Sequence, residues 1–353
     1  MTTPAPLTIA VIGLGARART WLKVIAANPD LKISALCDPA EAARNRAAEQ
    51  FSGTPVVASV AEALALQPDA VLLCTPPSGR ADQIEAACRA GVAILAEKPL
   101  ADSLAEAAHF VRMAEDAGIP LIVGLNFRYL EVTQAKRDLL RKGAVGTPEF
   151  GRFLYERWRD GTQPHLNKYP LHMVHPMLWE QSVHHFDLMR YVYGTDARRV
   201  MADTFNPSWS HYAGDTNVAA LFDFTNGMRL TYQGTWQGGL DRLDFDWRTD
   251  CSEGVVAQRD MFGDLQMARR GDGTLAPVPL PQHEPWISDA TGLLESFVAT
   301  LRGTAAPECT GRDHLHSLAM LEACIAASDR GAPVWLEEFA DLTGPAQLEK
   351  EQT

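Results

Sequence analysis

The 353-residue sequence lacks any long hydrophobic run and any closely spaced pair of cysteines. A membrane-spanning helix needs about 18 uncharged apolar residues, and no stretch of the sequence approaches that length. The apolar run at residues 7–14 follows no basic segment, so we interpret it as a strand and not as a signal peptide. The six cysteines form no CxxC pair, which disfavours both a disulfide framework and a thiolate metal site. We therefore expect a cytoplasmic protein that does not bind membranes.

Basic residues are also scarce. The sequence has 32 lysines and arginines against 44 aspartates and glutamates, which gives a formal net charge of -12. Because binding to nucleic acids depends on basic residues that displace counterions, we expect no nucleic-acid partner. The remaining composition, 46% hydrophobic and 22% charged, is typical of a globular chain, and the length favours two domains.

The first 125 residues alternate between buried strands and helices. Strands that alternate with helices ending at glycines indicate βαβ units and a parallel sheet. We therefore predict a doubly wound Rossmann domain over residues 1–125. Its expected strands lie at 7–13, 32–37, 70–74, 92–95 and 119–124, and its expected helices at 16–27, 39–50, 78–90 and 103–117.

The periodicity changes after this domain. Residues 228–236 and 242–249 alternate strictly between apolar and polar side chains, which is typical of strands with one covered face. Asn226 and Gly227 precede the first of these runs and predict a two-residue hairpin turn. We therefore predict an α/β protein whose second domain, residues 126–353, is an α+β domain for substrate binding and oligomerisation. Its mostly antiparallel, open-faced sheet would be covered by helices at 129–141, 180–193, 292–301 and 312–328.

A glycine-rich turn connects the first strand to the first helix. It reads Gly13, Leu14, Gly15, Ala16, Arg17, a variant of the dinucleotide-binding fingerprint in which glycines let a pyrophosphate approach the backbone. Asp38 ends the next strand, where a carboxylate can accept both ribose hydroxyls of NAD and would repel the 2′-phosphate of NADP. We predict NAD as the cofactor. NADP stays an alternative because of four nearby arginines: Arg17, Arg19, Arg44 and Arg46.

Four segments together resemble the Gfo/Idh/MocA family of NAD(P)-dependent oxidoreductases, which includes inositol and sugar dehydrogenases. In the family's order they are CTPPSGRADQIEAACRAGVAILAEKPLADS (74–103), GLNFRY (124–129), EQSVHHFD (180–187) and NGMRLTYQGTW (226–236). The sequence departs from the family at Arg80, where a histidine is common. It also departs at Glu180 and Ser182, where many members have Asp and Gly.

The resemblance implies that the Thr75–Pro76 turn and Glu97 lie at the cofactor, and that Lys98 is catalytic. The physical environment favours the same role, because Lys98 follows the strand at residues 92–95 and ligands bind at the carboxyl ends of such strands. Burial and the positive charge of an oxidised nicotinamide both disfavour its ammonium form. Lys98 could therefore exchange a proton with a substrate hydroxyl.

The segment at residues 180–187 supplies the other predicted catalytic residues. On a regular helix Glu180, His184 and Asp187 share one stripe, and the resemblance implies an acid and a histidine at Glu180 and His184. Histidine titrates near neutrality, and a carboxylate one turn away can orient it as a general base. His185 points away from this stripe, so we leave it outside the predicted site.

We expect a dehydrogenase that transfers a hydride between nicotinamide and a hydroxyl-bearing carbon of a sugar, polyol or inositol. The same residues could serve an NAD-dependent glycosidase that oxidises the sugar transiently, and a non-catalytic regulator that binds sugar or NAD is a further alternative. The presence of Lys98 and His184 disfavours the regulator. We predict no metal site, because the histidines near the second-domain helix lack a third ligand at recognised spacing and lie among prolines: His165, His172 and His175.

The segment from Arg152 to Lys168 contains four basic and two acidic residues, which gives it a local net charge of +2. Arginine presents a planar fork of donors that suits carboxylate or phosphate groups. We therefore expect an anionic sugar anchored by Arg157 or Arg159, with Asn126 and Arg128 as further substrate residues. A basic loop that only faces water is the alternative.

The outward face of residues 242–249 carries charges in the order plus, minus, minus, plus, namely Arg242, Asp244, Asp246 and Arg248. This order could complement itself across a twofold axis. Related enzymes commonly pair through this sheet, so we predict a homodimer or homotetramer. A solvated sheet face is the alternative.

Overall fold

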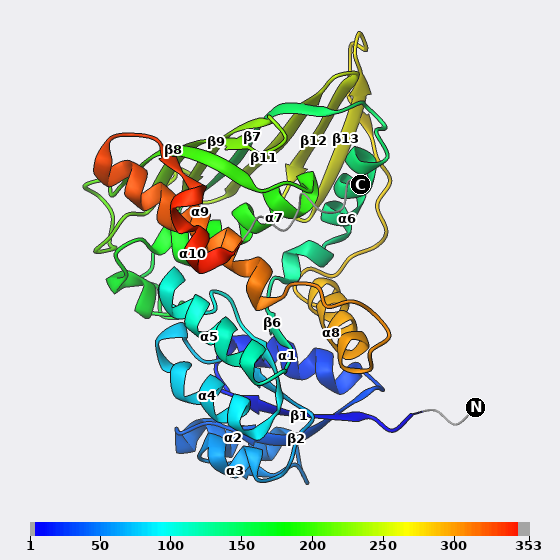
Figure 1. Cartoon of the computed structure of the whole chain (residues 1–353), viewed down its shortest axis with the longest axis vertical. Helices are drawn as coiled ribbons and strands as arrows, with labels where there is room; N and C mark the ends of the chain where they lie inside the picture. Colours follow the sequence, from blue (N-terminus) through cyan, green and yellow to red (C-terminus); the bar gives the residue numbers. More distant parts are fainter. Residues whose placement is uncertain (1–3, 345–353) are drawn as a thin grey trace. The chain divides into compact units, whose positions relative to one another are not determined.

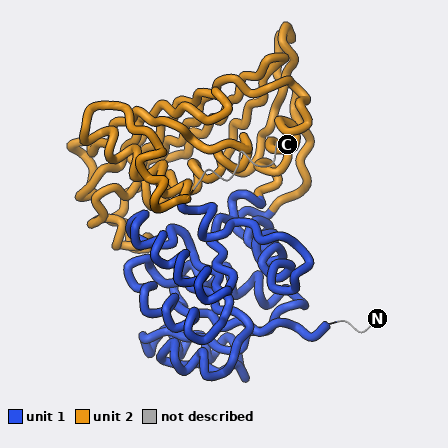
Figure 2. The backbone as a smooth tube through the Cα atoms, viewed as in Figure 1, with its two compact units in different colours: residues 1–129, 284–315 blue, residues 130–283, 316–353 orange. Residues whose placement is uncertain are grey.

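The computed structural model describes residues 4–344, which form two compact units (Figure 2). Unit 1 takes the chain up to Tyr129 together with Glu284–Leu315. Unit 2 takes Leu130–His283 together with the residues from His316 onward. No helix among the described residues is both long and apolar enough to span a membrane.

Unit 1 is built on a parallel six-stranded sheet in the order β3-β2-β1-β4-β5-β6, which confirms the predicted Rossmann fold. Its strands are β1 (Leu7–Ile12), β2 (Leu31–Cys37), β3 (Val56–Val57), β4 (Ala70–Leu73), β5 (Ala93–Ala96) and β6 (Leu121–Val123). Its helices are α1 (Ala16–Ala27), α2 (Glu41–Gln50), α3 (Val60–Leu64), α4 (Ala81–Ala90) and α5 (Leu104–Asp116), with short 3-10 turns at η1 (Pro77–Gly79) and η2 (Asn126–Tyr129).

The central strands of this sheet are apolar because they are covered on both faces. Every residue from Ile9 to Ile12 is almost fully buried. The short elements β3 and α3 were not predicted from the sequence. Helix α3 nevertheless begins at a readable capping box, in which the Ser59 hydroxyl accepts from the Glu62 amide and the Glu62 carboxylate accepts from the Ser59 amide.

Residues 284–315 belong to unit 1 with the Rossmann sheet, and not to the second domain predicted over residues 126–353. Helix α8 (Ser288–Leu301) contacts α1 and η2. At the end of β6 the Val123 amide donates to the Cys309 carbonyl over 2.8 Å. Unit 1 is therefore discontinuous in sequence, which a scan of local periodicity does not reveal.

Unit 2 is built on a nine-stranded sheet in the order β14-β13-β12-β11-β7-β10-β9-β8-β15. Only β7 and β10 pair in parallel among these described strands. The strands are β7 (Pro148–Arg157), β8 (Ala197–Phe205), β9 (Asn217–Phe224), β10 (Arg229–Thr235), β11 (Leu243–Cys251), β12 (Gly254–Asp260), β13 (Gly263–Arg269), β14 (Ala276–Pro277) and β15 (Val334–Trp335). This sheet confirms the predicted mostly antiparallel layer.

One side of this sheet is covered by helices α6 (Glu131–Arg141), α7 (Val183–Tyr193) and α9 (Gly311–Arg330) (Figure 1). Phe186 of α7 packs edge-on against Tyr232 of β10, with ring centroids 5.0 Å apart. The hairpin between β9 and β10 is present, but its turn has three residues and not the predicted two. The Phe224 amide donates to the Met228 carbonyl, and Gly227 adopts a φ of +88° between them.

The opposite side, which we call the open face, carries the charges predicted to pair across a twofold axis. They are already paired within the chain, as Arg242–Asp244, Arg248–Asp250, Arg152–Asp246 and Arg259–Asp246. Two of these pairs, Arg152–Asp246 and Arg259–Asp246, join neighbouring strands, and the other two join residues two apart along the chain. Large apolar side chains are exposed on the same face, on β7, β8 and β9: Phe150, Met201 and Leu221.

Candidate active site

The glycine-rich turn of unit 1 has the geometry that a dinucleotide needs. Gly13 has a φ of +88°, and a Cβ atom there would lie 3.0 Å from the Thr75 side chain and 3.1 Å from the Cys74 backbone. A Cβ atom on Gly15 would meet no described atom within 4 Å. Because Gly15 caps the N-terminus of α1, the backbone there is open to an anion such as a pyrophosphate.

Asp38 is braced against this turn at the end of β2. Its Oδ2 atom accepts from the Leu14 amide and its Oδ1 atom from the Ala40 amide, both over 2.8 Å. The half-buried carboxylate therefore fits the predicted contact with the ribose of NAD. Arg44 donates to the carbonyls of Asp38 and Pro39, so one of the arginines that would favour NADP lies at the same strand end.

Glu97, directly after β5, is buried and holds α1 in place. Its carboxylate accepts from the Trp21 indole over 2.6 Å and from Arg17 Nε over 2.5 Å. Burial would raise the pKa of Glu97, but Arg17 and the Trp21 N–H outweigh it and hold the pKa below its usual range. Arg17 also donates to Asn126, which donates to Asp289 of α8. Neither Trp21 nor Asp289 was predicted at this site, because neither belongs to a motif.

Arg80 binds the backbone of the segment that carries Lys98. The residue is only 1% exposed, and Lys98 is half-buried. The guanidinium donates to four backbone carbonyls, those of Thr75, Glu97, Pro99 and Leu100. One arginine therefore connects the Thr75–Pro76 turn to the Lys98 segment. In the sequence Arg80 was visible only as a departure from the family pattern.

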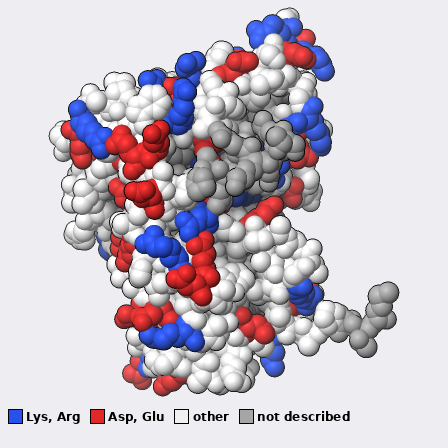
Figure 3. Space-filling view, viewed as in Figure 1, with Lys and Arg blue, Asp and Glu red and all other residues white. Residues whose placement is uncertain are grey.

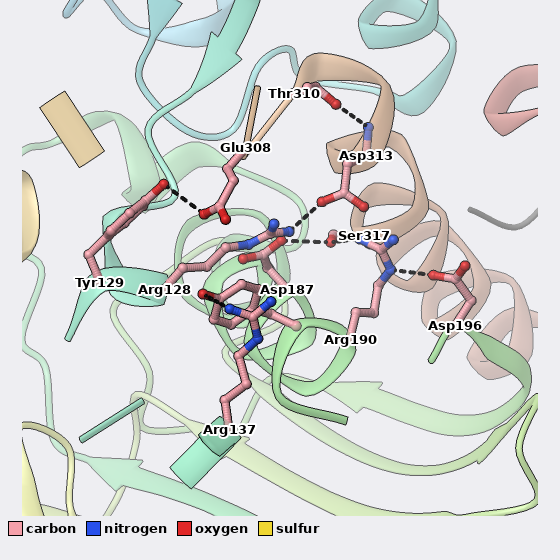
Figure 4. Close-up of polar contacts among 11 residues, drawn as sticks. Arg128, Tyr129, Arg137, Asp187, Arg190, Asp196, Glu308, Thr310, Asp313 and Ser317 are labelled. Atoms are coloured by element: carbon pink, nitrogen blue, oxygen red, sulfur yellow. Dashed lines mark hydrogen bonds and ion pairs between the residues drawn. The ribbon is translucent and has the colours of Figure 1, made fainter. Parts of the chain in front are cut away.

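Arg128 is ion-paired within unit 1 (Figure 4). Its guanidinium lies 2.5 Å from the Asp313 carboxylate, and both side chains are mostly buried. The adjacent Tyr129 donates to Glu308 over 3.0 Å. Because Asp313 balances the charge of Arg128, an anionic substrate at this arginine would have to compete with an internal carboxylate.

In unit 2, Glu180 and His184 lie where a π-helical turn, η4 (Met177–Ser182), leads into α7. The regular helix expected from residue 180 is therefore wrong at its start, and the wider turn changes the angle between Glu180 and His184. His184 is 6% exposed and Glu180 is half-buried. Such π turns recur at functional sites, and nothing in the local sequence predicted this one.

A chain of hydrogen bonds attaches this turn to the sheet. The Tyr155 hydroxyl of β7 donates to Gln181 Oε1 over 3.2 Å, so Gln181 Nε2 donates to Nε2 of His185 over 3.1 Å. His185 Nδ1–H then donates to the Tyr232 hydroxyl over 2.9 Å, and Tyr232 donates to Ser182 over 2.8 Å. These contacts hold His185 within the core, on the sheet side of the helix.

The other polar residues of α7 are bound within unit 2 (Figure 4). Asp187 is 1% exposed and accepts from the Ser317 hydroxyl over 3.2 Å, while Arg190 pairs with Asp196 over 2.6 Å. Arg157 is exposed at the end of β7. Unit 1 therefore gathers the predicted cofactor residues, and unit 2 carries Arg157 with the histidine and acid at the start of α7.

The histidines considered for metal binding do not cluster. His172 ends a short 3-10 turn, η3 (Tyr169–His172), and His175 lies 3.2 Å from Asp215. Across residues 4–344, no three His, Cys, Asp or Glu side chains are grouped as metal ligands.

Two family models match the chain. Residues 7–125 match the Gfo/Idh/MocA model, an oxidoreductase family with an NAD-binding Rossmann fold, and residues 133–257 match the C-terminal domain of the same family. The chain belongs to the Gfo/Idh/MocA family. The predicted resemblance is confirmed, and so is NAD as the cofactor of an oxidoreductase.

Relatives of this Gfo/Idh/MocA protein cover nearly all of its length. A D-apiose dehydrogenase from Paraburkholderia graminis is 30% identical, over 94% of this chain and 90% of that protein. An inositol 2-dehydrogenase from Rhizobium meliloti is 25% identical, over 89% and 94% of the two chains. The fold matches that of an oxidoreductase from Agrobacterium radiobacter in complex with NAD+, L-tartaric acid and magnesium. The TM-score is 0.86 at 23% identity, over 95% of this chain and 100% of that one.

Proposed function

We propose that this protein is an NAD-dependent dehydrogenase that transfers a hydride between nicotinamide and a hydroxyl-bearing carbon of a sugar, polyol or inositol. The observation that carries the proposal is the glycine turn, open at Gly15 and braced by Asp38, on a chain that also has Lys98 and His184 in the family's motifs. The names of the relatives, a D-apiose and an inositol dehydrogenase, support a polyhydroxylated substrate.

The cofactor site that we propose comprises the glycine turn and the strand ends beside it: Gly13, Leu14, Gly15, Ala16, Arg17, Asp38, Thr75, Pro76, Glu97 and Lys98. When bound, NAD supplies a nicotinamide ring that exchanges a hydride with the carbinol carbon. From the family's motifs we assign the transfer of the substrate's hydroxyl proton to Lys98 and His184. Glu180 and Asn126 complete the proposed substrate contacts.

We further propose that the enzyme is a cytoplasmic homodimer or homotetramer assembled through the open face of the unit 2 sheet. Phe150 and Met201 on this face are 58% and 54% exposed, which is unusual for large apolar side chains unless a partner covers them. All six cysteines lie in the described part of the chain and none forms a disulfide, which suits a reducing compartment.

The proposal is tested by measuring NADH absorbance with NAD and a panel of sugars, polyols and inositols, beside release of an aryl leaving group from matching glycosides. Net NADH formation is the expected result. Leaving-group release without net NADH would identify a glycosidase instead. No reaction in either assay, with NAD binding intact, would identify a regulator.

A further inference from the structure

Two arginines at the end of β7 lack the carboxylate partner that most arginines of unit 2 have. No ion pair forms at Arg157 or Arg159 within residues 4–344. By contrast, seven other arginines of the unit pair with aspartates: Arg152, Arg190, Arg199, Arg229, Arg242, Arg248 and Arg259. Because neither guanidinium has a carboxylate partner among the described residues, both can offer N–H donors to an external acceptor.

Arg159 is held in a fixed orientation by an aromatic side chain. Its guanidinium carbon lies 4.2 Å from the centroid of the Trp236 ring, and the Tyr212 ring packs 5.4 Å from the same tryptophan. Both aromatic residues are buried, whereas Arg159 is half-buried. A guanidinium that stacks by its flat face keeps its N–H edges available, and less entropy is lost when those edges bind a ligand.

Arg157 lies next to the helix start that carries the proposed catalytic acid. It follows Tyr155 by two residues on one strand, so both side chains lie on the same face of the sheet. Burial raises the pKa of Tyr155, and the adjacent Arg157 guanidinium acts in the opposite direction. The Tyr155 hydroxyl donates to Gln181, the residue after Glu180. The two arginines therefore flank the same part of unit 2 as Glu180.

The nearby acidic residues form no ion pair with Arg157 or Arg159 in the described part of the chain. Asp160 accepts three hydrogen bonds from Thr162 and Gln163, and Glu156 lies on the other face of the strand by alternation. The chain as a whole has a net charge of -12, and acidic and basic side chains are mixed over the surface drawn in Figure 3. An anion would therefore be attracted to this place by a local pair of arginines and not by the overall charge.

We propose that Arg157 and Arg159 form a subsite for an anionic group on the substrate, so that the dehydrogenase acts on an acidic sugar. A carboxylate or a phosphate has the oxygen geometry that accepts two parallel N–H donors from a guanidinium. The inference rests on the proposed function for the reaction, but it is a statement about binding and is measured without turnover.

The test compares acidic sugars with their neutral parents on the NAD-loaded protein. D-glucuronate and D-galacturonate supply the carboxylate, D-glucose 6-phosphate supplies the phosphate, and D-glucose and D-galactose are the neutral parents. Binding is measured by calorimetry and thermal shift, and turnover by NADH formation. We expect at least one acidic sugar to bind more tightly than its parent, and to bind more weakly as the salt concentration rises.

Variants then attribute the preference to the two arginines. Arg157→Gln and Arg159→Gln should each weaken binding of the acidic sugar by about 10- to 100-fold, because each removes a charge-assisted hydrogen bond. Arg159→Lys keeps the charge but loses the planar fork, so its loss should be intermediate. The matched control is Arg198→Gln, which removes an exposed arginine that stacks 5.6 Å from Trp335 and should change nothing.

The outcomes separate the two proposals. If neutral sugars bind as tightly as acidic ones, if no acidic sugar binds, or if both glutamine variants keep the wild-type preference, the anionic subsite is wrong. Turnover of a neutral sugar alone would leave the dehydrogenase proposal standing while the subsite fails. Tight arginine-dependent binding of an acidic sugar without NADH formation would support the subsite and contradict the dehydrogenase.

Discussion

Asp38 carries the expected preference between the two nicotinamide cofactors. Its carboxylate accepts two backbone amides and still faces the glycine turn. We predict that wild-type protein binds NAD more tightly than NADP and that Asp38→Ala narrows the gap, because the charge that repels a 2′-phosphate is lost. Asp38→Asn keeps an acceptor for the Leu14 amide but removes the charge. It therefore distinguishes the effect of the charge on cofactor choice from the effect of the hydrogen bond that holds the turn. Fluorescence titration with NAD and with NADP gives the dissociation constants that test this prediction. Tighter binding of NADP by the wild type would mean that Arg44 binds the 2′-phosphate instead.

Lys98 and His184 are expected to act on a step after cofactor binding. We predict that Lys98→Ala abolishes turnover while NAD affinity stays within a few-fold of the wild type. His184→Ala should lower kcat by about 10² to 10⁴, the usual range for a positioned acid or base. Steady-state kinetics and NAD titration measure both effects, with the exposed Lys142→Ala as control. Near-normal turnover in either variant would remove that residue from the mechanism.

Between elements, Arg80 connects the turn after β4 to the segment after β5. A lysine has the same charge but cannot reproduce a fork that reaches four carbonyls. We predict that Arg80→Lys lowers kcat by about 10- to 100-fold through displacement of Lys98, with a smaller change in NAD affinity. Arg89→Lys, on the exposed surface of α4, is the matched control. Unchanged kcat in Arg80→Lys would show that the Lys98 segment is positioned without this contact.

Glu97 connects α1 to the same strand end, and this contact should depend on pH. Because its pKa in the folded state lies below the unfolded value, the stabilisation is present above about pH 4.3 and is lost as the pH falls through the folded pKa. We predict that Glu97→Gln lowers the free energy of unfolding at pH 7 by about 1–3 kcal/mol. The difference from wild type should shrink in acid. Urea denaturation at several pH values measures it, with Glu85→Gln on α4 as the exposed control; a constant difference would exclude the ionic contribution.

An element could be predicted from the sequence where the residues within it or beside it mark its start and end. Helix α1 was predicted at its observed bounds, because a glycine turn starts it and Asn28-Pro29 ends it. The π turn η4 and the return of α8 to unit 1 were not predicted, since neither has a local signature. The same limit applies to the site. Asp38 could be found from its spacing to the glycines, whereas Trp21 and Asp289 reach Glu97 and Asn126 only through hydrogen bonds between residues far apart in the sequence.

For the whole molecule, the open face of unit 2 supports an oligomer through its exposed apolar side chains and not through the complementary charges that the sequence suggested. Its charges are satisfied within the chain, so exchange of ion pairs with a second copy would bring little energy. Met201 is directly opposite Leu221 in the pairing of β8 with β9, and Phe150 is exposed on β7, which β10 separates from β9. Apolar contact is therefore the expected source of association.

We predict that the protein is a dimer or larger at micromolar concentration and that Leu221→Asp dissociates it, because a charge would be buried at the centre of the apolar contact. High salt should leave the oligomer intact, since hydrophobic association is not screened. Arg242→Ala, which breaks an exposed pair on the same face, should have no effect and is the control. Light scattering after size exclusion measures the mass. A wild-type mass of 38.6 kDa would show a monomer and contradict the prediction. Dissociation by salt alone would show that ion pairs, and not apolar contacts, hold the copies together.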